Sequence, residues 1–491
     1  MKWLLGVGLC SALMSNVLVG AQPNVLVFFV DDMGWADTEI NGSTVYESPA
    51  QLRLAEDGLV FGQAYAHPLC SPSRAAILSG QYPGARFDMS RAITGGCVAN
   101  PSLPESFNPK YNMVWPGSRD HLPAEVTTLA ETLKDNGYQT WHLGKWHLRP
   151  AKKHQGDDVK SDPVDHGFEK WVGIGGSGPR SYFAPYKVPD FPQGPEGEYI
   201  GERMAQEACK LLESRDKDKP FFMYYACFNV HSPYQAKQDL IEYYEKKLKS
   251  MPADTKQTNP VMAAMLHGMD QELEVLLDKL DELQLTEETL IIFTSDNGGV
   301  HWEMSKKKDA PYSMPVTSNY PLRGGKCSWF EGGVRVPMTI RWPGKIPARQ
   351  RTETPAHIID IYPTVLNAAG IEPQPGQILD GVDLTPLLEN QTIPERPLFC
   401  HFPRSSTTED QLPGGSFVRM GNYKLIRMYG GADDGSDRYI LYNLKDDIGE
   451  TTDVAKDYPE KVASMKKKLN AWLAETGALV PKPNPAYADA Q

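Results

Sequence analysis

The chain has 491 residues, of which 41% are hydrophobic and 23% are charged, and its formal net charge at pH 7 is −12. This length can bury a large core and predicts about two or three domains. The acidic balance argues against a nucleic-acid-binding protein, and the composition is that of a folded globular protein.

The first 21 residues are expected to be a signal peptide rather than part of the fold. Lys2 gives a positive start, residues 3–19 are mostly apolar, and residues 19–21 form a small-residue cleavage site. Polar residues interrupt the apolar run, and no later stretch is long and apolar enough to span a bilayer. We therefore expect an exported protein, periplasmic or extracellular, with no membrane span after signal removal.

Six cysteines remain after the signal peptide: Cys70, Cys97, Cys209, Cys227, Cys327 and Cys400. They show no C-x-x-C spacing and are sparse for a chain of this length. The sequence therefore predicts neither a disulfide framework nor a zinc site, and it leaves open a single disulfide pair formed in an oxidising compartment.

Residues 24–30 form an unbroken apolar run rich in β-branched and aromatic residues, which predicts a parallel strand buried on both faces. The run ends in Asp31 and Asp32. Two carboxylates at the end of a buried strand are unfavourable unless a cation neutralises them, although a solvated turn is the simpler alternative.

Residues 70–80 predict a helix that begins at a cysteine. Pro72 suits the first helical turn, and small and apolar residues continue the helix after it. The positive end of the helix dipole therefore lies beside Cys70, with Arg74 one turn further on. This arrangement predicts a reactive group placed against an anion, and the alternative is a buried structural cysteine.

Further along the chain, three more strands end in chemically capable residues. Residues 84–122 are predicted to be a long loop, residues 125–136 a helix, and residues 139–143 a strand. Lys145 and His147 follow that strand.

A second buried strand, at residues 221–228, leads to His231, and a third, at residues 290–294, leads to Asp296 and Asn297. Between them, residues 259–285 predict a long helix whose methionine stripe is core packing. A glycine-rich loop with Lys326 follows.

From about residue 372, alternating segments predict a smaller antiparallel sheet, and residues 462–473 a closing helix. The predicted fold is α/β: a large mixed sheet flanked by helices, with a smaller C-terminal α+β subdomain. The expected division is a signal peptide (1–21), a catalytic domain (22–371) and a C-terminal subdomain (372–491).

Ligand sites in open α/β sheets lie at the carboxyl ends of the strands, so one crevice is expected to gather all of these groups. Asp31, Asp32, Asp296 and Asn297 offer only oxygen ligands, which suit Ca²⁺ or Mg²⁺. Fixed positive charge from Arg74, Lys145 and Lys326, with His147 and His231 for proton transfer, predicts hydrolysis of an anionic ester.

Residues 70–74, Cys-Ser-Pro-Ser-Arg, resemble the C-x-P-S-R signature of the type I sulfatases, in the alkaline-phosphatase-like superfamily. Further matching landmarks are residues 144–147, 231–233, 296–298 and 325–326. The resemblance covers nearly the whole mature chain. It implies that Cys70 is oxidised to formylglycine by a formylglycine-generating or anaerobic sulfatase-maturing enzyme.

In the mechanism that this resemblance implies, the hydrated aldehyde at Cys70 attacks sulfur while the metal polarises a sulfate oxygen. Residue 70 would thus also lie at the metal. His231 would protonate the leaving alcohol, and His147 would help to regenerate the aldehyde and expel sulfate. Two residues depart from the usual family sequence, Arg149 in place of a glycine and Cys327 in place of a small residue.

The expected substrate is a sulfated sugar, which would give the protein a role in polysaccharide degradation. Candidate sugar contacts in the long loop are Arg86, Arg91, Tyr111, Trp115, Arg119 and His121. The alternatives are an arylsulfatase of non-carbohydrate substrates, a phosphatase or phosphodiesterase of the same superfamily, and an inactive glycan-binding descendant.

Overall fold

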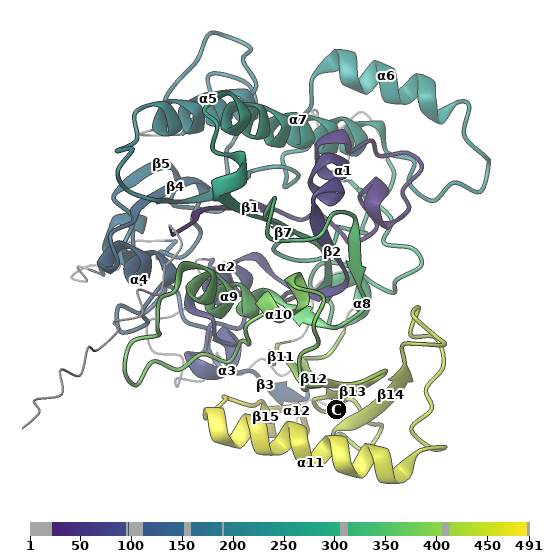
Figure 1. Ribbon diagram of the computed structural model, residues 1–491. Helices are drawn as coiled ribbons and strands as arrows, with labels where there is room; N and C mark the ends of the chain where they lie inside the picture. Colours follow the sequence, from purple (N-terminus) through teal and green to yellow (C-terminus); the bar gives the residue numbers. More distant parts are fainter. Residues whose placement is uncertain are drawn as a thin grey trace, which may run out of the picture.

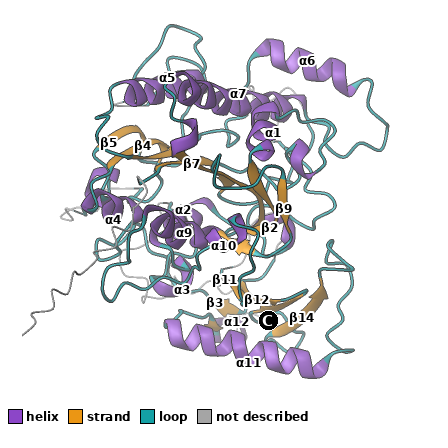
Figure 2. Ribbon diagram, in the orientation of Figure 1, coloured by secondary structure: helices purple, strands orange, loops and turns teal. Residues whose placement is uncertain are grey.

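A nine-stranded mixed sheet lies between two layers of helices, and a second, smaller sheet lies at one end of the molecule (Figures 1 and 2). The structure is a computed structural model. It describes residues 22–94, 97, 111–151, 159–188, 191–304, 313–404 and 412–488. The expected signal peptide lies outside these residues, as does part of the predicted loop 84–122.

The main sheet has the order β10-β2-β8-β7-β1-β6-β4-β5, and β9 also pairs with β2. Its strands are β1 (Asn24–Val30), β2 (Gly58–Tyr65), β4 (Gln139–Lys145), β5 (Lys170–Ile174), β6 (Phe221–Ala226), β7 (Thr289–Ser295), β8 (Arg335–Arg341), β9 (Gln350–Thr352) and β10 (Ala356–His357). Strand β1 is parallel to β6 and β7, whereas β8 is antiparallel to both of its neighbours. The predicted mixed sheet with a central parallel strand is confirmed.

Strand β1 contributes to hydrophobic cores on both faces of the sheet. Its alternate residues Val25, Val27 and Phe29 lie in one core, and Leu26, Phe28 and Val30 lie in the other. Every residue of the strand is buried. This is why the strand has no polar residue between Asn24 and the aspartates that end it.

Helices cover the main sheet on both faces (Figure 1). One layer contains α1 (Pro49–Glu56), α5 (Ile200–Glu213), α6 (Gln238–Leu248) and α7 (Pro260–Glu282), and the other contains α2 (Cys70–Ser79), α4 (Leu129–Asp135) and α9 (Ile361–Ala369). The predicted methionine stripe lies on α7, where Met262, Met265 and Met269 are buried. It is core packing, as expected.

Apart from one long helix of the C-terminal subdomain, the remaining helices of the described residues are short, and four turns there have 3₁₀ geometry. The short helices are α3 (Pro83–Arg86), α8 (Glu331–Val334), α10 (Thr385–Leu388) and α12 (Pro485–Ala488). The 3₁₀ turns are η1 (Glu39–Asn41), η2 (Pro163–His166), η3 (Thr286–Glu288) and η4 (Ile358–Asp360).

Two sequence predictions need correction. Helix α4 begins at Leu129 rather than near residue 125, because Thr128 caps it: the Thr128 hydroxyl accepts from Glu131 N, and the Glu131 carboxylate accepts from Thr128 N. The segment 84–122 is not a continuous loop. It holds the end of α3 and the short strand β3 (Met113–Val114), which pairs with β15 (Lys482–Pro483) near the C-terminus.

The C-terminal subdomain is an antiparallel sheet covered by one long helix, as predicted (Figure 1). Its strands are β11 (Leu398–Phe402), β12 (Gly415–Met420), β13 (Tyr423–Met428) and β14 (Arg438–Asn443), and the helix is α11 (Pro459–Thr476). Leu469 and Leu473 of α11 belong to the same hydrophobic core as Val25 of β1. The two subdomains are therefore packed as one body.

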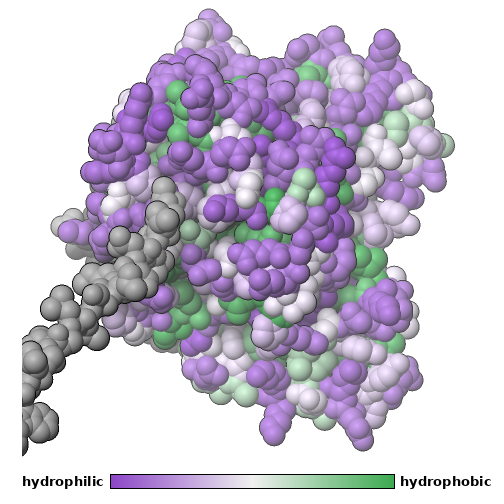
Figure 3. All heavy atoms as spheres, viewed as in Figure 1, coloured by the Kyte–Doolittle hydropathy of each residue, from purple (hydrophilic) through white to green (hydrophobic). Residues whose placement is uncertain are grey.

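The described part of the chain contains no helix long and apolar enough to cross a membrane. The face shown in Figure 3 is mostly hydrophilic, with hydrophobic residues in scattered patches. Each of the six cysteines expected in the mature chain is described, and these six have free thiols in the structure.

Candidate active site

The predicted convergence of strand ends is present in the structure. Strands β7, β1, β6 and β4 are consecutive neighbours in the sheet, and β1, β6 and β4 run parallel to one another, as do β1 and β7. Their carboxyl ends therefore lie at one edge. Candidate residues follow the ends of β1, β6 and β7. On β4, Lys145 is the last residue of the strand, and His147 comes after it.

Four oxygen-bearing side chains form the acidic centre of this edge. Asp31, Asp296 and Asn297 are fully buried, and Asp32 is 3% exposed. Asp32 N donates to Asp296 Oδ1 (3.0 Å), and Asn297 Nδ2 donates to Asp32 Oδ1 (2.9 Å). These two hydrogen bonds join the segment that follows β1 to the segment that follows β7.

Three cations meet these carboxylates. Lys145 Nζ donates to Asp31 Oδ2 (2.6 Å), and Lys326 Nζ donates to Asp32 Oδ2 (2.7 Å). Arg74 of helix α2 donates to Asp296 Oδ2 (2.9 Å) and to the Lys145 carbonyl (2.9 Å). The sequence therefore predicted correctly that these residues lie together.

The oxygen set fits a divalent cation. Asp31 Oδ1 and Asn297 Oδ1 are buried without a hydrogen-bond partner among the described residues. One Asp31 oxygen, one Asp32 oxygen and one His231 nitrogen also lie within 4.8 Å of one another. Unsatisfied buried oxygen atoms are costly, and a hard cation satisfies them.

Cys70 begins helix α2 and is 2% exposed. Its Sγ lies 3.3 Å from His147 Nδ1, and His147 Nε2 donates to the Ile93 carbonyl (3.0 Å). That hydrogen bond places the proton of neutral His147 on Nε2 and leaves Nδ1 as an acceptor facing Cys70.

His231 lies on the other side of the acidic centre. Its Nδ1 donates to the Ser232 carbonyl (2.8 Å), and its Nε2 lies 3.8 Å from Asp32 Oδ2. The side chain is 21% exposed, whereas Lys145 and Arg74 are at most 1% exposed. Of the candidate groups, His231 is thus among the more accessible to a molecule arriving from solvent.

Burial and neighbouring charges together set the pKa values of the site. Burial, and then the charge of Asp31, raise the pKa of Asp296 to about 7. Burial would also raise the pKa of Asp32, but the neighbouring charges, led by Lys326, lower it. Burial and the charge of Lys145 lower the pKa of both His147 and His231 to about 3, so that both imidazoles are neutral.

Three of the candidate sugar contacts make structural contacts within the protein. Arg86 forms an ion pair with Asp380 (2.5 Å), and Arg119 Nε donates to the Phe87 carbonyl (2.9 Å). Trp115 is buried in a small cluster with Tyr429 of the C-terminal subdomain. These contacts anchor the segment to the domain, which is the structural alternative to sugar binding for aromatic and basic residues of a long loop.

The remaining candidate sugar contacts are Tyr111, His121 and Arg91. Tyr111 packs against Trp115 at its edge and is 40% exposed. His121 Nδ1 lies 2.7 Å from Asp120 Oδ1. Arg91 contacts Thr94, next to the Ile93 carbonyl that holds His147. Of the segment 84–122, residues 95, 96 and 98–110 lie outside the described residues.

Sequence reasoning missed a buried polar cluster behind His231. Glu272 of α7 accepts from Asn229 Nδ2 (2.6 Å), and Tyr199 donates to Asn229 Oδ1 (2.8 Å). The Asn229 carbonyl in turn accepts from Asp31 N (2.9 Å). The available signal was a glutamate on the apolar face of an amphipathic helix, since a buried carboxylate needs partners.

The two departures from the usual family sequence have local explanations. Arg149 forms an ion pair with Asp162 (2.8 Å) and lies over the ring of Trp171. Cys327 has a positive φ of 68°, which favours glycine, and its N donates to the Pro68 carbonyl (2.9 Å). Neither residue displaces a candidate catalytic group.

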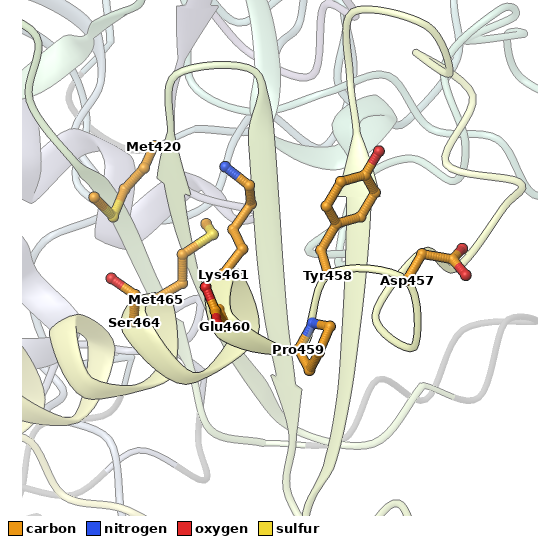
Figure 4. A pocket seen from close by; sticks show the side chains of 8 residues that line it. All are labelled: Met420, Asp457, Tyr458, Pro459, Glu460, Lys461, Ser464 and Met465. Atoms are coloured by element: carbon orange, nitrogen blue, oxygen red, sulfur yellow. The ribbon is translucent and has the colours of Figure 1, made fainter.

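A surface hollow of about 600 Å³ lies elsewhere, between β12 and the start of α11 (Figure 4). Its lining includes Met420, Tyr458, Lys461 and Met465. None of its lining residues belongs to the edge of the main sheet that gathers the candidate groups.

Comparison with known proteins identifies two family models. The model described as Sulfatase matches residues 23–371, and the model described as N-sulphoglucosamine sulphohydrolase, C-terminal, matches residues 325–477. The first match alone spans more than half of the chain.

Individual relatives cover most of the chain. It is 30% identical to N-acetylgalactosamine-6-sulfatase of Mus musculus over 404 residues, which are 77% of this chain and 68% of that protein. It is 30% identical to a sulfatase of Formosa agariphila over 527 residues, with coverage of 93% and 90%. A solved structure of Ps i-CgsB in complex with k-i-k-neocarrahexaose is similar with a TM-score of 0.73 at 27% identity, covering 92% and 93%.

The oxygen set predicts a cation that stabilises the fold. After chelation, added Ca²⁺ or Mg²⁺ should raise the melting temperature of the wild-type protein, because the cation binds only the folded state. In Asp31→Asn, which loses one ligand charge, the concentration needed for the same shift should rise about tenfold or more.

A matched control is Asp278→Asn, which removes an exposed carboxylate paired with Arg53 on another part of the surface. It should leave the cation-dependent shift unchanged. Equal cation dependence in Asp31→Asn and the wild type would contradict a metal site at Asp31.

Proposed function

Since the chain belongs to the sulfatase family and is a sulfuric ester hydrolase, we propose that it removes sulfate from sulfated sugars after export from the cytoplasm. We further propose that it uses a Ca²⁺ ion and a formylglycine made from Cys70. The observation that carries the proposal is the compact set of groups at one sheet edge, where Cys70, three cations and an unsatisfied oxygen cluster meet.

Relatives support the saccharide assignment. One named relative is an N-acetylgalactosamine-6-sulfatase, and one similar structure holds neocarrahexaose, so the proteins of comparable sequence include ones that act on or bind sugars. The apolar N-terminal segment after Lys2 supports export, which would bring the enzyme to extracellular polysaccharides.

The metal would be held by Asp31, Asp32, Asp296 and Asn297, and when bound it supplies a Lewis acid for a sulfate oxygen. Formylglycine at position 70 supplies the nucleophile once hydrated. A maturing enzyme is required as a partner, because an unassisted cysteine does not become an aldehyde.

The side chains around position 70 would hold the substrate anion and move protons. Lys326 and Lys145 offer ammonium groups to the sulfate oxygens while also neutralising Asp32 and Asp31. His147 Nδ1, at 3.3 Å from Cys70 Sγ, can accept a proton at that position, while its Nε2 stays bound to the Ile93 carbonyl.

His231 is placed to serve the leaving group. Its Nδ1 is fixed by the Ser232 carbonyl, and the partly exposed Nε2 faces the acidic centre. Because the Nδ1 of neutral His231 carries the proton, Nε2 must first take up a second proton. Transfer of that proton to the sugar oxygen would assist its departure, since a sugar alkoxide is a poor leaving group.

Active protein should carry formylglycine at position 70. Mass spectrometry of the peptide that contains this residue should show CHO in place of CH₂SH when a maturing enzyme is co-expressed. Cys70→Ala should fold but lose at least about a thousandfold in turnover, because the nucleophile is gone. Cys400→Ala, another buried cysteine, should retain activity. Full activity with an unmodified Cys70 would refute the modification.

The rate loss caused by removing the proposed acid, His231, should depend on the leaving group of the substrate. His231→Ala should slow sugar sulfates by about a hundredfold or more, and 4-nitrophenyl sulfate by less than about tenfold, because nitrophenolate departs without a proton. Steady-state kinetics on both substrates provide the comparison. Equal losses would mean that His231 binds sulfate rather than donating a proton.

A substrate panel tests the function directly. Sulfated mono-, oligo- and polysaccharides, aryl and steroid sulfates, and phosphate esters should be compared for release of sulfate or phosphate, with Cys70→Ala as the blank. We expect sulfate release from at least one sulfated saccharide. Turnover restricted to aryl or steroid sulfates would refute the saccharide assignment, and release of phosphate alone would refute sulfatase activity.

A further inference from the structure

A buried cluster of charged side chains joins the main sheet to the C-terminal subdomain. Lys424 of β13 lies between two carboxylates, 2.9 Å from Glu331 Oε1 and 3.0 Å from Glu450 Oε1. All three side chains are fully buried. Buried charge of this kind is unfavourable unless each member is well paired, so the geometry of the cluster is tightly constrained.

Glu450 holds both ends of the glycine-rich loop 323–333. At the start of the loop, Arg323 Nη1 donates to the Glu450 carbonyl (2.8 Å). At its end, Glu331 N donates to Glu450 Oε2 (2.6 Å). Helix α8, which begins at Glu331, lies on the side of the main body that faces β11–β14 (Figure 1). A single residue of the C-terminal subdomain therefore fixes the loop at two points.

The same loop delivers Lys326 to the candidate active site. The loop is closed by Gly332 N, which donates to the Arg323 carbonyl (2.8 Å), and Lys326 N donates to the Gly299 carbonyl (3.0 Å). From this position Lys326 Nζ reaches Asp32 (2.7 Å). The family model for the C-terminal region begins at residue 325, so it spans the Lys326 segment together with β13 and Glu450.

We propose that Glu450 and Lys424 are positioning residues for Lys326, so that the C-terminal subdomain sets the place of a sulfate-binding ammonium group. This inference rests on the proposed function, in which Lys326 contacts the sulfate. Glu450 is not placed to contact the substrate or the metal. It acts on the loop through its backbone carbonyl, which accepts from the Arg323 side chain, and through its carboxylate, which accepts from Glu331 N. A shift of about 1 Å in a group that positions substrate can cost about a hundredfold in rate.

A double-mutant cycle distinguishes positioning from simple stabilisation. The variants are Glu450→Ala, Lys326→Met and the double variant, assayed on 4-nitrophenyl sulfate well below their melting temperatures. If Glu450 acts through Lys326, Glu450→Ala should lower kcat/KM about tenfold in the wild type but have little further effect in Lys326→Met. Additive losses in the double variant would overturn the proposal.

Conservative variants distinguish a loss of positioning from misfolding. Glu450→Gln keeps an acceptor for Glu331 N and should lose less activity than Glu450→Ala, and Lys424→Arg should lose less than Lys424→Met. The matched control is Arg396→Met, which breaks the ion pair with buried Asp360 and contacts no residue of the loop. It should lower the melting temperature without changing kcat/KM.

Inorganic sulfate gives a readout that does not depend on turnover. Calorimetric titration of the wild-type protein with sulfate should show binding that weakens about tenfold in Glu450→Ala and not in Arg396→Met. Unchanged sulfate affinity in Glu450→Ala would refute the positioning role while leaving the proposed function intact. Absence of sulfate binding and of sulfate release in the wild type would instead refute the function, and the inference with it.

Discussion

Carboxylates buried side by side repel one another, and this constraint governs the edge of the main sheet. The three that meet there are Asp31, Asp32 and Asp296. Compensating ammonium and guanidinium groups come from β4, helix α2 and the glycine-rich loop, so the loops that carry them must converge for the fold to be stable. The three cationic side chains offset the negative charge of the three carboxylates. A bound divalent metal ion would add positive charge, which suits an anionic ester.

The central strands and the groups at their ends could be predicted because burial on both faces leaves a strong signal. Strand β1 is an unbroken apolar run, and a carboxylate directly after it stands out. Four such ends imply one crevice by the geometry of parallel strands alone. The C-terminal hairpins were predictable because their alternating residues have the period of a β-strand. In the structure both faces of this sheet contribute to hydrophobic cores, and β11 is buried along its whole length.

The remaining features depend on contacts between distant parts of the chain. Nothing near Thr128 distinguishes the start of α4 except its own capping box, which lies inside a longer helical pattern. The anchoring contacts of Arg86 and Trp115 could not be predicted from the sequence, because their partners, Asp380 and Tyr429, lie hundreds of residues away in the chain. Glu450 is likewise unremarkable in sequence, and only the fold brings it to the loop that carries Lys326.

Under the proposed modification of Cys70, the burial of this residue would set an order of events during biogenesis. Every residue of helix α2 is buried, and the Cys70 side chain packs against His147 inside the finished fold. An enzyme that oxidises Cys70 must reach its side chain, and the folded protein leaves that residue only 2% exposed. Oxidation would therefore have to precede folding, during or soon after synthesis. A chain that folded first would be stable yet permanently inert, so the yield of active enzyme would reflect a competition between two rates.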